Sequence, residues 1–208
     1  MPAVAEKKDL LNFDFDRPFF ANDDLPVGQV VHYSIFIKGN LPLTSGNRFR
    51  VSDDGVVYGR LMNNKSILEL YKVAAMGLMP DFSNKKLILE AVDSSFLFDD
   101  FSNLDAWKEK NFYSYDLIVP PSKADSLYHY MLDDLNRYSG YYGRVEYRNT
   151  PCLTIVRKGN GDRLMTKGGE PENHLFFPND RYLRNEPVNV LVAELNNNTP
   201  NMKMLVVD

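Results

Sequence analysis

The chain has 208 residues, of which 44% are apolar and 25% are charged, so its composition is that of a globular protein and excludes disorder throughout. Its net charge of −4 excludes a general electrostatic affinity for nucleic acids or for anionic membranes. The single cysteine excludes an internal disulfide and a zinc site built from cysteines. No apolar run approaches the roughly 20 residues that cross a bilayer, so we expect no membrane insertion.

The first part of the chain predicts a linker followed by β-structure. We expect residues 1–30 to form a linker or an irregular wrapping segment, because prolines and a glycine interrupt a phenylalanine-rich stretch. β-Branched and aromatic residues then predict a strand over residues 30–38. Asp53-Asp54-Gly55 predicts a hairpin turn between strands at residues 48–52 and 56–61, because glycine tolerates a positive φ.

A helix and a further strand are predicted next. Apolar residues at positions 67, 70, 71, 74 and 75 recur with a period of 3.6 and form one face of a helix. We expect Asn64 to cap this helix and Gly77 to end it, since a proline follows three residues later. The pattern of residues 86–92 predicts a strand, and that of residues 94–111 predicts a loop with one short helical turn.

The middle of the chain predicts a strand, a helix and two more strands. Residues 113–119 form the first strand, which ends at two prolines. A Ser-x-x-Asp capping box at residues 122–125 predicts the start of an amphipathic helix that ends near Gly140. We expect strands at residues 144–148 and 152–157, joined by a short turn that contains a proline.

The last part of the chain predicts a loop, a helix and a strand. Residues 158–184 contain four glycines and little periodicity, which is typical of a loop. A helix is expected to begin at Pro187, because proline suits the first helical position. Its buried stripe is expected to consist of Val188, Leu191, Val192 and Leu195. Residues 202–207 predict the final strand.

Together these elements predict a two-layer α+β fold, in which about three amphipathic helices bury their apolar faces on a mixed or antiparallel sheet. Residues 31–208 would form a single domain, and the similar strand–helix–strand units at residues 48–92 and 113–157 suggest an internal repeat. Because the chain stops directly after a predicted buried strand, we expect it to be truncated at its C-terminus and to derive from a longer parent protein.

Several short motifs occur in a characteristic order over about residues 45–208. They are Arg48-Phe49-Arg50-Val51, Ile67-Leu68-Glu69-Leu70-Tyr71, Tyr115-Asp116-Leu117, Met131-Leu132-Asp133-Asp134-Leu135, Cys152-Leu153-Thr154-Ile155-Val156, Lys167-Gly168-Gly169, residues 187–195 and Val206-Val207-Asp208. In this order they resemble an uncharacterised bacterial domain family noted as abundant in soil acidobacteria. Related versions follow TlpA-like thioredoxin domains in exported proteins.

This resemblance implies a fold and a compartment. It implies a covalently linked thioredoxin-like domain and a periplasmic or extracellular location through the longer parent; a chain complete as given would be cytoplasmic. The family usually continues past the final aspartate, so the resemblance also implies truncation. No activity is established for the family, and the resemblance therefore implies no reaction.

The reactive residue types show no pattern that is typical of a catalytic or metal site. His32, His129 and His174 share no metal-ligand spacing, and we expect His129 to face solvent. Cys152 begins a predicted strand, where we expect a buried and unreactive thiol. Adjacent carboxylates such as Asp133-Asp134 point apart, and we assign that pair to a solvated helix face. We therefore predict no catalytic residue, no metal and no cofactor.

One cluster of residue types favours binding. Tyr138, Tyr141 and Tyr142 lie close in sequence to Arg144 and Arg148. Tyrosine and arginine are enriched at binding hot spots, so we take these five residues as the candidate binding site. The alternative is that the three rings only cover the corner between a helix and a strand.

The leading functional hypothesis is a non-enzymatic binding or accessory module of the bacterial envelope. Its expected partner is an envelope protein or peptide, and no nucleic acid, with a partner strand adding to an open sheet edge. Two alternatives stay open. One is an enzyme of hydrolase type whose site forms only in the folded chain, and the other is a structural domain that positions the redox site of a thioredoxin-like parent.

Overall fold

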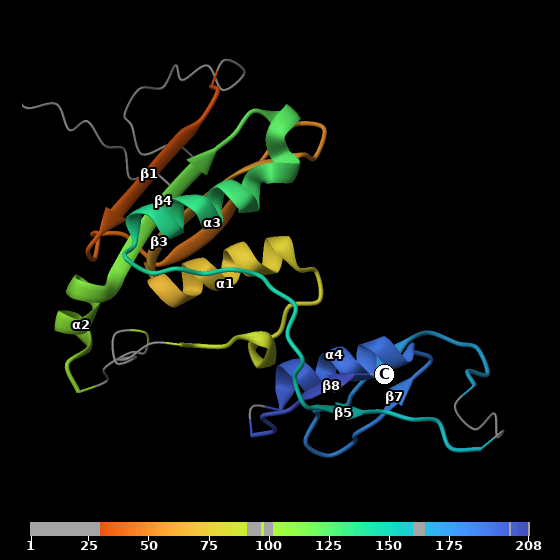
Figure 1. Cartoon of the computed structure of the whole chain (residues 1–208). Helices are drawn as coiled ribbons and strands as arrows, with labels where there is room; N and C mark the ends of the chain where they lie inside the picture. The colour runs from red at the N-terminus through yellow and green to blue at the C-terminus, as the bar shows by residue number, and fades with distance from the viewer. Residues whose placement is uncertain (1–29, 91–96, 98–101, 160–164, 200, 208) are drawn as a thin grey trace, which may run out of the picture. The chain divides into compact units, whose positions relative to one another are not determined.

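A computed structural model of the chain describes residues 30–90, 97, 102–159, 165–199 and 201–207 (Figure 1). The chain forms two compact units: unit 1 draws on residues 1–78 and 91–145, and unit 2 on residues 79–90 and 146–208. The predicted α+β class is confirmed, because the described part contains a four-stranded antiparallel sheet, two small sheets and four α-helices. The predicted linker over residues 1–30 lies outside the described residues, apart from Val30.

Unit 1 is built on the four-stranded sheet. Its strands are β1 (Tyr33–Lys38), β2 (Gly46–Val51), β3 (Val57–Ser66) and β4 (Phe112–Ile118), in the order β1-β4-β3-β2. β1 and β2 therefore lie at opposite edges, and the loop that joins them crosses one end of the sheet. The hairpin prediction is confirmed, because β2 pairs antiparallel with β3 and Gly55 in the turn has a φ of +84°.

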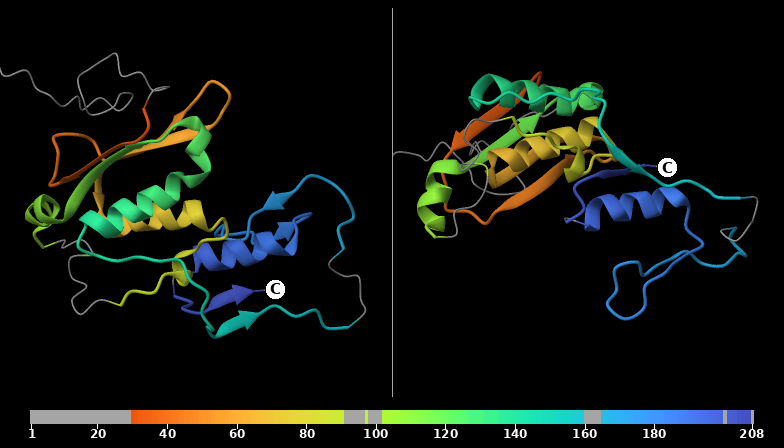
Figure 2. Two further views of the ribbon diagram at one scale, coloured as in Figure 1. Left: turned by 45° about the horizontal axis from the view of Figure 1, so that its top comes forward. Right: turned by 60° about the horizontal axis from the view of Figure 1, so that its bottom comes forward.

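Two helices cover one face of this sheet, which we call the helix face. Helices α1 (Ile67–Leu78) and α3 (Leu127–Tyr138) lie side by side over it (Figure 1 and Figure 2). Alternate side chains of β4 point toward them because successive strand residues face opposite sides. The resulting buried cluster consists of Met62, Ile67, Leu70, Ala74, Tyr113, Tyr115, Leu117, Val119, Leu127, Met131 and Leu135. The helical apolar stripes predicted for this part of the chain are therefore largely confirmed.

The start of α1 differs from the prediction. Asn64 does not cap the helix; it lies within β3 with a φ of 51°, next to a break in the register of β3 with β4. Its side chain accepts a hydrogen bond from the Leu41 N–H at 2.8 Å and donates to the carbonyls of Leu41 and Leu43. Ser66 and Glu69 form a capping box instead: the Ser66 Oγ accepts from the Glu69 N–H at 3.2 Å, and the Glu69 carboxylate accepts from the Ser66 N–H at 2.9 Å.

The elements around α3 also differ in detail from the prediction. The predicted capping box is wrong, because Pro121–Ser126 forms a 3₁₀ helix and no side chain caps it or α3. The expected end of α3 is confirmed, since Gly140 follows it with a φ of +82°. In the segment predicted to be mostly loop, α2 (Leu104–Asn111) forms two helical turns, and its buried Trp107 packs edge-on against Phe112 at 5.8 Å.

Unit 2 contains short strands and one longer helix. β5 (Cys152–Thr154) pairs in parallel with β8 (Leu205–Val207), and β6 (Glu172–Asn173) pairs antiparallel with β7 (Leu183–Arg184). α4 (Val188–Asn198) lies beside β8. The side-chain amide of Asn196 on this helix exchanges two hydrogen bonds, at 2.8 and 2.9 Å, with the backbone of Val206.

Two predicted strands are wrong. Residues 87–90 have no regular structure after a 3₁₀ helix at Asn84–Lys86, and residues 91–92 lie outside the described part. Residues 144–148 are also irregular, so β5 pairs with β8 rather than with the segment that precedes it. A strand is stabilised by its neighbour, and the local apolar pattern of a segment does not specify which neighbour it will have.

Unit 2 buries little of its described part. No residue of α4 is fully buried, and Val188 is exposed, so its predicted stripe is only partly covered. Among the described residues of this unit, only Ser83 and Val206 are buried. In the part of the chain that the structure describes, no helix is long and apolar enough to cross a membrane.

Candidate functional site

A groove of about 760 Å³ opens on unit 1 between β1 and α3, and we call it the β1–α3 groove. Its strand side is lined by His32, Ser34, Phe36, Lys38 and Tyr113. Its helix side is lined by Asp134, Arg137, Tyr138 and Ser139. The groove therefore combines aromatic rings with side chains of both charges.

The strand side of the groove follows from the twofold periodicity of a β-strand. Ser34, Phe36 and Lys38 all point to the helix face, where each opposes an inward-pointing residue of β4 in register. The buried cluster contains side chains of β3 and β4 but none of β1, where Phe36 is only partly buried. The edge strand β1 therefore presents the wall of an open groove beside α3.

Asp134 joins this strand wall to the helix. Its Oδ2 accepts a hydrogen bond from the Ser34 hydroxyl at 2.6 Å and another from the Tyr115 hydroxyl at 2.7 Å. Only 9% of the residue is exposed, so its assignment to a solvated helix face is wrong. Burial, followed by the nearby Asp134 carboxylate, raises the pKa of Tyr115. The phenol is therefore held in its neutral, donating form.

Cations lie on both sides of the groove. The Lys38 ammonium lies 5.7 Å from the centre of the Tyr113 ring, and the Arg137 guanidinium lies 5.8 Å from that of Tyr138. A hydrogen bond with Tyr138 raises the pKa of Arg137, which stays charged. The carboxylate of Asp134 already accepts two hydrogen bonds from the protein, so the two cations are the charges best placed to meet a ligand.

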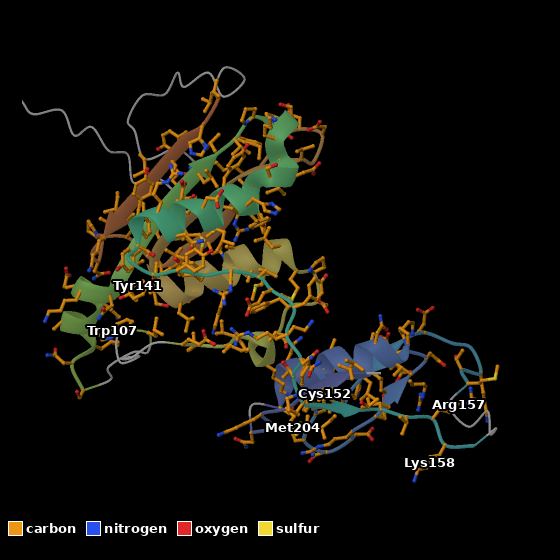
Figure 3. The ribbon with its side chains drawn as sticks, viewed as in Figure 1. Trp107, Tyr141, Cys152, Arg157, Lys158 and Met204 are labelled. Carbon is orange, nitrogen blue, oxygen red and sulfur yellow. The ribbon has the colours of Figure 1, made fainter. Side chains whose placement is uncertain are left out.

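The five predicted binding residues do not all contribute to this groove. Tyr138 lines it and is 62% exposed, and Tyr142 is 74% exposed. Tyr141 packs in part against the buried cluster, and its carbonyl accepts a hydrogen bond from the Tyr71 hydroxyl at 2.9 Å (Figure 3). Arg144 belongs to unit 1 and has an interaction partner of its own.

Arg148, the fifth predicted residue, belongs to unit 2. Its guanidinium donates to the Glu90 carboxylate at 2.8 Å and forms an ion pair with Glu146. Arg148 is therefore held by two carboxylates of its own unit. The proposal that all five residues bind one partner stays a prediction.

The structure contradicts the predicted burial of the cysteine and confirms the predicted exposure of one histidine. The predicted burial of Cys152 is wrong, because this free thiol is exposed at the start of β5 (Figure 3). The exposed position of His129 on α3 is confirmed. His174 packs against the rings of Phe177 and Tyr182, at 4.6 Å from each. Among the residues that the structure describes, no three His, Cys, Asp or Glu side chains are grouped to hold a metal ion.

Sequence reasoning did not identify most of the groove. The signal that could have found its strand side is the alternation of Ser34, Phe36 and Lys38, which puts one polar, one aromatic and one basic residue on the same face. The helix side forms only where α3 packs beside β1. These two segments lie about 100 residues apart in the sequence, so no local pattern predicts their contact. No protein-family model matches the chain, and searches of curated proteins and of solved structures found no significant match.

Proposed function

We propose that the chain is a binding module whose β1–α3 groove holds a short, extended peptide with acidic side chains. The observation that carries this proposal is the placement of Lys38 and Arg137 on opposite sides of one groove lined by aromatic rings. Aromatic and arginine side chains of this kind dominate the energetics of protein–peptide binding. The proposal agrees with the binding role expected from the sequence and assigns it to a surface that includes only Tyr138 of the five predicted binding residues.

The dimensions of the groove suit such a ligand. Its volume of about 760 Å³ falls within the range of roughly 300–1,000 Å³ that is usual for ligand sites. The lining residues of the strand side run from His32 to Lys38, which is about 20 Å along an extended chain. A peptide of about six residues in the extended conformation has the same length.

The chemistry of the lining specifies the peptide further. Carboxylates of the ligand would meet Lys38 and Arg137, which are both exposed, so each contact would add a modest Coulomb attraction that salt screens. Phe36, Tyr113 and Tyr138 offer apolar faces to the side chains between these carboxylates. A periplasmic or extracellular location, a thioredoxin-like parent, an enzymatic activity and a role in positioning a redox partner all stay predictions.

Fluorescence anisotropy with labelled hexapeptides tests the proposal. We expect pools rich in Asp, Glu and aromatic residues to bind, and pools rich in Lys to bind much more weakly. The variant K38E/R137E should lose affinity for the acidic pool by at least about tenfold, since repulsion replaces attraction at two positions. Added salt should weaken the wild-type interaction.

A matched charge reversal serves as the control. Lys110 and Lys123 are exposed residues of unit 1 that do not line the groove, so K110E/K123E changes the net charge equally. It should retain the affinity of the wild type to within a factor of two to three. Equal binding of acidic and basic pools, or equal losses in the two double variants, would contradict the proposal.

A further inference from the structure

A buried arginine on the helix face of unit 1 has incomplete hydrogen bonding. Arg60 of β3 lies directly opposite Leu117 of β4, a member of the buried cluster, and only 2% of Arg60 is exposed. Its Nη2 donates a hydrogen bond to the side-chain oxygen of Asn47 on β2. Its Nε and Nη1 are buried and have no hydrogen-bond partner among the described residues. Buried polar groups are nearly always hydrogen-bonded, so two donors of this guanidinium remain available to an acceptor.

The charge of Arg60 is not balanced by an acidic side chain of the described part. An arginine keeps its proton in a protein, so burial leaves a full positive charge in surroundings that solvate it poorly. Burial lowers the pKa of Arg60, and the nearby Tyr128 of α3 opposes this effect only in part. A phenol does not supply the counter-charge that a carboxylate would. A buried charge without a counter-charge is costly to a fold, and such costly groups are concentrated at functional sites.

The ring of Phe49 covers this guanidinium. Phe49 of β2 lies directly opposite Arg60, and the guanidinium carbon is 3.8 Å from the centre of the ring. A stacked ring attracts a cation but accepts no hydrogen bond from N–H groups that lie in the guanidinium plane. β2 is an edge strand and Phe49 is 58% exposed, so its side chain can rotate toward solvent. The ring is therefore a movable cover over a charged group with two available donors.

We propose that Arg60 binds a small oxyanion, of carboxylate or phosphate type, and that Phe49 rotates away to admit it. Such an anion would supply the counter-charge and accept hydrogen bonds from the planar guanidinium, whose geometry suits both carboxylates and phosphates. Asn47 would orient the guanidinium through its bond to Nη2. None of these three residues lines the β1–α3 groove, so the inference does not depend on the proposed function.

Titration of the full-length chain with inorganic phosphate and with acetate, at constant ionic strength, tests the proposal. The Nε–H signal of Arg60 in NMR spectra should shift and saturate with at least one of the two anions, which identifies the type of ligand. The unfolding temperature should rise with the same saturation, because the anion binds the folded chain. R60M should lose the saturating rise, whereas R48M, which removes an arginine from the opposite face of β2, should keep it.

Variants of β2 test the movable cover. F49A should bind the anion at least about threefold more tightly, because the stacked ring no longer competes with the open state. V51A changes another exposed side chain of the same strand and should leave the affinity within a factor of two of the wild type. An affinity of F49A that equals that of the wild type, or falls below it, would overturn the proposal.

The groove variant K38E/R137E distinguishes this site from the β1–α3 groove, and it should keep the response to the anion. A response that is lost in K38E/R137E and kept in R60M would place the anion in the groove and overturn the proposal. An Arg60 signal that responds to neither anion would overturn it as well. If R60M does not fold, R60K takes its place; lysine keeps the charge without the planar donors, so the affinity should fall at least about fivefold.

Discussion

Tyr115 and Asp134 show how a single buried contact ties β4 to α3 and couples stability to pH. The pKa of Tyr115 is raised, first because burial disfavours the phenolate and then because Asp134 repels it. The folded pKa thus lies above the unfolded value of about 10, so the unfolded chain binds fewer protons above pH 10. This contribution to stability is complete below pH 10 and falls at higher pH, by at most about 1.4 kcal/mol per pH unit.

Tyr115→Phe should therefore reduce the loss of stability between pH 10 and 11.5. It should also lower the free energy of unfolding at pH 7 by about 1–2 kcal/mol, because Asp134 loses one of its two donors. Burial raises the pKa of Tyr71 and Tyr113 as well, so the slope should become shallower and not vanish. Urea unfolding at several pH values measures this, and the exposed Tyr147→Phe is the control. Equal slopes in wild type and Y115F would contradict the prediction.

The residues of the groove show which site features a sequence can predict. Tyr138 was predicted as a binding residue because tyrosines and arginines, which are enriched at binding hot spots, cluster near it in the sequence, and it does line the groove. Asp134 was assigned to solvent, since helical periodicity places it beside the apolar stripe and does not reveal Ser34 and Tyr115 as its partners. Cys152 was expected to be buried because its strand was expected to be long and covered.

Gly77 of α1 lies where this helix packs closely against α3. It was expected to end α1, yet the helix runs on to Leu78, and a β-carbon at Gly77 would lie 2.1 Å from the Tyr128 ring. Gly77→Ala should therefore lower the free energy of unfolding by about 1–3 kcal/mol, despite a gain of about 1 kcal/mol in helix propensity. Denaturant unfolding measures the change, and Met76→Ala, at an exposed position of the same helix, should change it by less than about 0.5 kcal/mol.

A double variant separates overpacking from other effects of this substitution. Tyr128→Ala removes the ring that the new methyl group would strike, so G77A/Y128A should be no less stable than Y128A alone. A G77A protein as stable as the wild type would contradict the close approach of α1 and α3. Additive losses in the double variant would show that the cost does not arise from contact with Tyr128.

For helices and strands, the sequence predicted most of the local structure correctly but did not predict which strands pair with each other. The β2–β3 hairpin, β4 and helices α1 and α3 were predicted because a turn glycine or a period of 3.6 is a local property. The strands at residues 86–92 and 144–148 were wrong, although their residues have β-propensity. β-Propensity takes effect through cross-strand contacts, and β5 finds its partner in β8, about 50 residues away.

The two units of the molecule differ in how much they bury. The described part of unit 1 has a cluster of eleven buried side chains, whereas the described part of unit 2 buries only Ser83 and Val206. Local opening requires less free energy where few apolar contacts are lost. The backbone amides of unit 2 should therefore exchange with deuterium much faster than those of β3, β4 and α3.

α3 and α4 provide a matched comparison, because they contain 12 and 11 residues, respectively, and differ chiefly in burial. Four residues of α3 are buried and none of α4 is, so tertiary packing protects α4 much less than α3, and isolated helices of this length are marginal in water. After correction for intrinsic rates, α4 amides should exchange at least roughly 100-fold faster than α3 amides. Hydrogen exchange with mass spectrometry measures both in one sample. Equal protection would mean that a cover from outside the described residues, or a partner, stabilises unit 2.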